Sequence, residues 1–326
     1  MNDSAWLRTH YLALTEGVGV SPLSGRTLLE VRGSDRTQFL NGFCTNNIKA
    51  VAPGQGCEAF VTSPQGKTLG HVLVFCEPDR LWLDTSPGQA AALIAHFDKY
   101  VISEDVQFVD RSAETGLLLV AGKQAGEVLS QLTGQEPPST MLAAARGKIG
   151  EFDLRLARVP YVPDGYFVWL APRDVVPALE PLMQAGAVLC TIVTVEAARI
   201  AAGFPLFGSD ISEDNLPQEV GRDAQAISFT KGCYLGQETV ARIDALGHVN
   251  KKLVGLKFGS ADPPLPNTPL MAGDKEVGRV TSAAWSPALN APLALGYVRT
   301  IHARPGTPLV SAIGSAEIVK LPVESR

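Results

Sequence analysis

The residues with the clearest chemical potential form the segment KGCYLGQE, residues 231–238, in which a cysteine stands between two glycines. The following residues, 237–246, carry apolar side chains every three positions and precede Gly247, a pattern that predicts a helix with a glycine stop. Cys233 would then lie on a turn before a helix N-terminus, where free backbone N–H groups and the helix dipole favour an anion. An adjacent Lys231 ammonium would favour the thiolate further, and the thiolate is the nucleophile and the metal ligand.

The alternative for any free cysteine is a structural one, as a small buried apolar side chain. The chain has 5 cysteines, and none forms a CxxC pair, so neither a zinc knuckle nor a dithiol redox motif is expected. The four outside the glycine-flanked segment fit the structural role: Cys44, Cys57, Cys76 and Cys190. For Cys233 the glycines, the lysine and the helix start favour a functional role.

Bulk composition excludes several classes of protein. With 326 residues, the chain exceeds what one hydrophobic core usually serves, so two or three domains are expected. The formal net charge of −5 argues against a non-specific nucleic-acid binder. No HExxH, GxSxG or complete phosphate-loop motif occurs. The N-terminal residues lack the apolar core of a secretory signal, and no segment is long and apolar enough for a membrane span, so we expect a cytoplasmic protein.

Strand-like and helix-like segments alternate without a regular βαβ rhythm, which predicts an α+β fold. Residues 26–32, 58–63 and 69–76 have the composition of strands, and Thr194 is the expected N-cap of a helix. After residue 247, short apolar runs separated by Pro and Gly predict a small all-β domain. We therefore expect a body over residues 1–246, made of two interleaved α+β subdomains, and a C-terminal β-barrel over residues 247–326. The polar, irregular stretch that leads into the Cys233 segment is expected to be functional.

At this point a family resemblance emerges. KGCYLGQE matches the signature K-G-C-aromatic-x-G-Q-E of YgfZ-type folate-binding proteins, and shorter matches are spread along the chain. They are GSD at 33–35, FLNG at 39–42, GFP at 203–205, NLPQE at 215–219 and GRVTSAAWSP at 278–287. The chain thus resembles this family, which belongs to the superfamily of the glycine-cleavage aminomethyltransferase, or T-protein.

The resemblance implies a T-protein-like multi-domain ring around a channel that takes tetrahydrofolate. It also implies an accessory role in assembling or repairing iron–sulfur clusters of client enzymes, including enzymes that modify tRNA. The expected partners are folate and iron–sulfur client or assembly proteins, without direct nucleic-acid or membrane contact and without a metal site. Cys233 and Lys231 would carry the chemistry. The residues expected to contact the folate are Glu219, Gly232, Tyr234, Gly236 and Gln237.

Two positions depart from T-proteins. The catalytic aspartate of those enzymes aligns with Gly70, which has no proton-accepting group, so glycine-cleavage activity is not expected and the protein is not expected to be a classical enzyme. His71 follows as a possible base, although a lone histidine on a strand is more often structural. Ala201 stands where T-proteins have a glutamate that supports the folate pocket. Two alternatives remain: a folate-dependent one-carbon transferase or demethylase, and a binding module that uses folate to set its shape.

Overall fold

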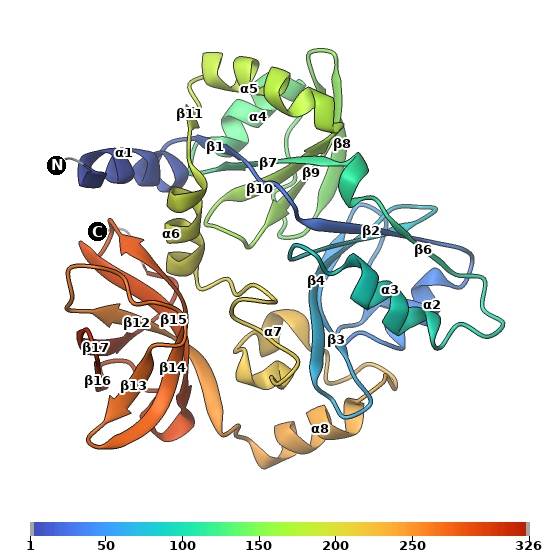
Figure 1. Ribbon diagram of the computed structural model, residues 1–326. Helices are drawn as coiled ribbons and strands as arrows, with labels where there is room; N and C mark the ends of the chain where they lie inside the picture. Colours follow the sequence, from blue (N-terminus) through green and yellow to red (C-terminus); the bar gives the residue numbers. More distant parts are fainter. Residues whose placement is uncertain (1–2, 324–326) are drawn as a thin grey trace.

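Two β-sheets and a closed β-barrel organise the chain in the computed structural model, which describes residues 3–323 (Figure 1). The sheets form two lobes and the barrel a third. The segment after α6 (Ile192–Ala202), drawn in yellow, passes between the lobes and carries the short helix α7 (Asp223–Ala226). All strand pairs in the two sheets are antiparallel except that of β1 (Gly19–Pro22) with β11 (Val188–Leu189). This confirms the α+β class predicted from the sequence.

The first sheet has five strands in the order β3-β4-β5-β2-β6. Their bounds are β2 Thr27–Arg32, β3 Gly56–Thr62, β4 Thr68–Cys76, β5 Leu81–Thr85 and β6 Gln107–Asp110. Helices α2 (Arg36–Asn41) and α3 (Ala90–Asp98) cover one face and bury Leu40, Leu93 and Phe97 against it. Because side chains alternate along a strand, the opposite face is free to join the central core of the molecule.

The second sheet has six strands in the order β11-β1-β7-β10-β9-β8. Their bounds are β1 Gly19–Pro22, β7 Gly116–Ala121, β8 Ala144–Ile149, β9 Phe152–Val159, β10 Gly165–Leu170 and β11 Val188–Leu189. Helices α4 (Ala125–Thr133) and α5 (Val175–Gln184) pack on one face through Leu129 and Leu182. Helix α1 (Asp3–Thr15), which the sequence analysis did not anticipate, packs on the other face through Leu14.

The barrel closes in the strand order β12-β15-β14-β13-β16-β17. Its strands are β12 Lys251–Phe258, β13 Pro269–Ala272, β14 Lys275–Ser286, β15 Ala291–Arg299, β16 Pro308–Ser311 and β17 Gly314–Val319. Closure pairs every strand on both sides and leaves no free edge. Helix α8 (Gln237–Leu246) ends at Gly247, which has the left-handed φ of 72° predicted for its stop, and leads into the barrel. The domain boundary at 246/247 stays a prediction.

One apolar core joins the three lobes. It contains side chains from both sheets, such as Phe75 and Phe167, together with Val195 of α6 (Ile192–Ala202) and Leu295 of the barrel. Helix α6 begins two residues before the predicted N-cap Thr194, with Thr191 at the cap position. Fully burying each large apolar side chain contributes about 1.5–3 kcal/mol, so this shared core holds the lobes in a fixed arrangement.

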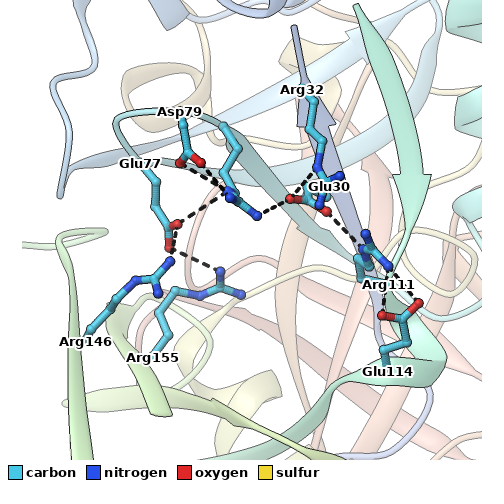
Figure 2. Close-up of polar contacts among 9 residues, drawn as sticks. Glu30, Arg32, Glu77, Asp79, Arg111, Glu114, Arg146 and Arg155 are labelled. Atoms are coloured by element: carbon cyan, nitrogen blue, oxygen red, sulfur yellow. Dashed lines mark hydrogen bonds and ion pairs between the residues drawn. The ribbon is translucent and has the colours of Figure 1, made fainter. Parts of the chain in front are cut away.

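Ion pairs cross the seam between the two sheets (Figure 2). Glu77, after β4, accepts from Arg146 of β8 at 2.6 Å and from Arg155 of β9 at 3.4 Å. The Arg155 guanidinium also lies 4.1 Å from the ring centroid of Trp82 and 4.9 Å from that of Trp169. These contacts add polar links to the apolar ones. Among the described residues, no helix is long and apolar enough to cross a membrane.

Candidate functional site

The loop before α8 is held against the first sheet by Lys231. Its ammonium is buried and donates to the backbone oxygens of Asn41 at 2.6 Å, Cys44 at 2.6 Å and Asn46 at 2.8 Å. Burial lowers the pKa of Lys231 to about 8, opposed by its interactions with the thiols of Cys44 and Cys57. An ammonium has three donors, and all three are used here. Lys231 therefore anchors the loop. The sequence had predicted instead that its ammonium would stabilise the Cys233 thiolate.

Cys233 is exposed, and it lies three residues before Gly236, the N-cap of α8. The position before a helix start is the one predicted. The other cysteines are free thiols too; three of them are buried, and Cys57 is half-buried. Burial raises the pKa of Cys44 and Cys190 to about 12, which keeps those thiols neutral. Among the five cysteines, all within the described residues, Cys233 alone faces solvent.

Some neighbours of Cys233 are buried and pack against the protein interior, whereas others are exposed. Tyr234 is buried in a small apolar cluster with Phe60 and Val240, so its ring supports the loop from inside. The side-chain oxygen of Gln237 accepts from the Tyr234 N–H at 3.3 Å. Gly232 is exposed, and a Cβ built on it meets nothing within 4 Å, so its backbone is open to a ligand.

Gly236 locks the loop to the turn between β3 and β4. Its φ of 81° is left-handed, and an added Cβ would lie 2.3 Å from the Ser63 oxygen and 2.9 Å from the Gly66 backbone. Only glycine tolerates both the conformation and the contact. Further bonds come from the Leu235 N–H to the Gly42 oxygen at 2.8 Å and from the Thr62 hydroxyl to the Leu235 oxygen at 2.6 Å. Gly236 therefore has a structural role, whatever it contacts in a complex.

Glu219, the predicted pterin contact, ends the short 3-10 helix Pro217–Glu219 and is buried. Its Oε2 accepts from the Asn215 side chain and from the Leu216 N–H, each at 3.2 Å, and lies 3.6 Å from the Lys251 ammonium. Its Oε1 makes no hydrogen bond to a described residue. One carboxylate oxygen thus braces the loop against the barrel, while the other keeps its lone pairs for a ligand N–H.

A buried polar cluster, Glu58, His71 and Arg222, joins the first sheet to the segment before the cysteine loop. The Arg222 guanidinium binds both Glu58 oxygens, with Nη2 to Oε2 at 2.6 Å, and His71 Nε2 lies 2.7 Å from Oε1. The His71 ring lies between those of Phe60 and Phe204, with centroids at 5.1 and 5.4 Å. Burial alone would raise the pKa of Glu58, but the hydrogen bonds and charges of Arg222 and His71 hold it at about 2. The carboxylate is therefore ionised and orients the imidazole.

His71 was predicted from the sequence as a lone residue, without its partners Glu58 and Arg222. Glu58 faces His71 from β3, and Arg222 arrives from 164 residues further along the chain. The one available signal was a charged residue inside an otherwise apolar strand, which requires a buried partner. Gly70 points to the opposite face of β4, where an added Cβ would lie 3.0 Å from Leu93 of α3. His71, rather than position 70, faces the middle of the molecule.

Both parts of the chain match family models. Residues 3–231 match the GCVT N-terminal domain, and residues 251–323 match the glycine cleavage T-protein C-terminal barrel domain. The chain belongs to the glycine cleavage T-protein family. It is similar to the aminomethyltransferase of Symbiobacterium thermophilum, with 30% identity over 311 residues, 90% of this chain and 82% of the relative. The aminomethyltransferase of Streptomyces avermitilis is 28% identical over 92% of this chain and 83% of its own length.

The T-protein fold extends over almost all of the described chain. The crystal structure of the glycine cleavage system aminomethyltransferase T from Bartonella henselae superposes with a TM-score of 0.82, at 20% identity, over 98% of this chain and 90% of that one. This likeness confirms the fold predicted from the sequence, with its C-terminal barrel. Folate binding is in keeping with the family, and the Oε1 of Glu219, which accepts no hydrogen bond from a described residue, fits an N–H donor of a pterin ring.

Proposed function

We propose that this T-protein family member is a tetrahydrofolate-binding accessory factor for the assembly or repair of iron–sulfur clusters in client enzymes. The exposure of Cys233 carries the proposal, because the other four cysteines are at least half-buried. The KGCYLGQE segment adds the resemblance to YgfZ-type proteins, whose clients include tRNA-modifying enzymes. An exposed thiol on a firmly anchored loop suits contact with a partner protein better than chemistry on a small enclosed substrate.

Folate would be held from the loop that carries Glu219. That carboxylate would accept an N–H of the pterin through Oε1 while Asn215 and Lys251 keep Oε2 in place. Gly232 lies on the loop before α8, Gln237 is the first residue of α8, and both would border the ligand. The residue lost relative to T-proteins is the aspartate aligned with Gly70, and this loss favours binding over glycine-cleavage turnover.

Two measurements test the proposal. In a strain lacking the protein, a Cys233→Ser variant should fail to restore the activity of iron–sulfur enzymes, whereas the matched Cys57→Ser variant should restore it. Equal rescue by both variants would remove Cys233 from the function. In calorimetric titrations with tetrahydrofolate, Glu219→Ala should weaken binding by about tenfold or more, since a buried hydrogen bond to a charged group is worth about 1.5–3 kcal/mol. Glu213→Ala, an exposed glutamate of the same loop, is the control.

A second candidate is a folate-dependent one-carbon transferase or demethylase acting on a small amine. The relatives named aminomethyltransferase favour it, as does the Glu58–His71 pair, which has the arrangement of an oriented base. Incubation with tetrahydrofolate and small methylated amines tests this candidate. Formation of 5-methyltetrahydrofolate and the demethylated amine by the wild type, lost in His71→Gln, would favour it over the accessory role.

A further inference from the structure

The outer edge of the second sheet combines a strand that is paired on one side only with exposed apolar side chains. Strand β11 is the last strand of that sheet in the described chain, and Figure 1 shows it at the margin of the second lobe, between α5 and α6. Six exposed apolar residues of β11 and the adjacent helices form what we call the β11 patch: Trp6, Met183, Val188, Leu189, Ile192 and Val193. None of them belongs to the Cys233 loop, the Glu219 loop or the Glu58 cluster, so the patch is separate from the site described above.

Contacts between the elements make the β11 patch continuous. Met183 lies in the last turn of α5, which leads into β11, and Ile192 begins α6 shortly after β11 ends. Trp6 joins them from α1. Its ring packs against that of His10, with 4.9 Å between the centroids, and the His10 backbone oxygen lies 3.5 Å from the Cys190 sulfur. Helix α1 also contacts β11 and α6, so the six side chains lie on one surface.

The segment that carries most of the patch has no charged residue. Between Glu180 and Glu196, residues 181–195 contain no Asp, Glu, Lys, Arg or His, although many of them are exposed. Sheet edges of monomeric proteins are commonly protected by charged side chains or by proline on the edge strand, and β11 has neither. A continuous apolar surface of this kind in a folded protein is typical of an interaction site.

The backbone of β11 keeps one residue ready to pair with another strand. The Val188 N–H donates to the Val18 oxygen at 3.0 Å, and the Cys190 N–H donates to the Val20 oxygen at 2.7 Å. Because alternate residues of a strand direct their N–H and C=O groups to opposite sides, those of Leu189 point away from β1. A second β11 running antiparallel would exchange two N–H···O bonds with them, with a two-fold axis at Leu189.

We propose that the β11 patch binds a second copy of this chain, giving a two-fold symmetric dimer in which the two Leu189 residues pair. The six side chains expose roughly 500 Å² in each copy, so a dimer would bury about 1,000 Å², which reaches the lower limit of a specific interface. A two-fold contact places each residue near its own counterpart, and an uncharged segment permits this without repulsion between like charges. The alternative occupant is a different protein, which would leave the isolated chain monomeric.

Sedimentation equilibrium of the full-length protein in the micromolar range tests the dimer. We expect a species of twice the 34.6 kDa mass of one chain. Val193→Lys should weaken association by at least about hundredfold, because it places a charge from each copy in an apolar contact. Val310→Lys is the matched control, since Val310 lies on the barrel and is 57% exposed, against 56% for Val193. A wild-type protein that stays monomeric, or a dimer that Val193→Lys leaves intact, would overturn the proposal.

Cross-linking tests the pairing at Leu189. In a hydrogen-bonded antiparallel pair the two Cα atoms lie about 5.5 Å apart, a distance that a disulfide spans. Leu189→Cys, in a Cys233→Ser background that removes the natural exposed thiol, should therefore form a covalent dimer under mild oxidation. Val310→Cys in the same background should not. Because the contact is apolar, association should also persist when the salt concentration is raised. Equal cross-linking of the two cysteine variants, or dissociation in salt, would overturn the proposed pairing.

Discussion

Glu58 and Asp84 lie in one row of the first sheet, yet their surroundings shift their pKa values in opposite directions. Both lie opposite Leu73 of the strand between them, so they point to the same face. Both are almost fully buried and both are paired with an arginine. The pKa of Glu58 is lowered to about 2, whereas that of Asp84 is raised.

The difference between the two carboxylates comes from hydrogen bonding. Arg222 and His71 fill both oxygens of Glu58, so the bonds to the charged form outweigh the cost of burial. Arg26 donates hydrogen bonds to only one oxygen of Asp84, so the effect of burial on the pKa dominates. An arginine neighbour is thus not sufficient to keep the pKa of a buried carboxyl below its usual value. We call the Glu58 region a closed polar cluster, because charged donors or His71 bind both carboxylate oxygens, and the Asp84 region an open one, because Arg26 binds one oxygen only.

The largest effect is expected from breaking the closed cluster. Arg222→Met leaves the ionised Glu58 buried with only His71, and we expect the free energy of unfolding to fall by about 3–5 kcal/mol. Urea denaturation at neutral pH measures this loss. Arg242→Met, at an exposed position of α8, should change stability by no more than about 0.5 kcal/mol. Equal stability of the two variants would show that Glu58 does not depend on its arginine.

Acid should distinguish the two carboxylates next. Glu58 binds its proton less readily when folded, so its contribution, present above pH 4.5, is lost as the pH falls towards about 2. The loss is roughly 3 kcal/mol, and Glu58→Gln should flatten this part of the stability curve. Asp84 has a raised pKa, so its protonation favours the folded state, and Asp84→Asn should steepen the same curve. Urea denaturation between pH 3 and 7 checks both signs, and parallel curves for the three proteins would contradict them.

A smaller effect is expected from Arg26→Met. Asp84 can respond to the loss of its partner by taking up a proton, so the cost should be about 1–3 kcal/mol, less than for Arg222→Met. For the same reason, the decrease in the free energy of unfolding should be greater at pH 8 than at pH 5. Thermal and urea denaturation at both values measure it, with the exposed Arg173→Met as the control. A loss that does not vary with pH would mean that Asp84 stays charged in the variant.

The smallest effect is expected when Asp84 itself becomes neutral. Asp84→Asn keeps an acceptor for Arg26 and loses no bond at Oδ2, so we expect a cost of about 1 kcal/mol or less. Glu58→Gln, the same change in the closed cluster, should cost about 3 kcal/mol because it weakens charged bonds at both oxygens. Denaturation of the pair under identical conditions makes the comparison. Equal costs would remove the distinction between the closed and the open cluster.

Local patterns in the sequence were sufficient for much of the fold. The helix over 237–246 with its glycine stop, the strands β2 to β4 and the C-terminal barrel all follow from spacing and composition. Helix α1 was missed, although Leu7, Tyr11 and Leu14 have helical spacing and are buried. The fold as a whole came from the family resemblance, because strand order depends on contacts that no local pattern encodes.

Only those features of the site that depend on residues close together in the sequence could be predicted. The exposed position of Cys233 before a helix follows from its own segment. The direction of the Lys231 ammonium does not, since its acceptors lie between residues 41 and 46, more than 180 positions away. Arg222 meets Glu58 across a similar gap in the chain. Which distant groups come within hydrogen-bonding reach is decided by the tertiary fold.

The anchoring of the loop at Gly236 has a mechanical consequence. Lys231, Leu235 and Gly236 all fasten to residues of the first lobe, between positions 41 and 66. In the proposed role, a client protein that binds the Cys233 sulfur would therefore transmit force to the β3–β4 hairpin directly, and to the barrel through α8 and through the apolar cluster that joins Tyr234 to Leu253 of β12. A spin label on the exposed hairpin residue Gln65 would report the resulting change in the mobility of the hairpin.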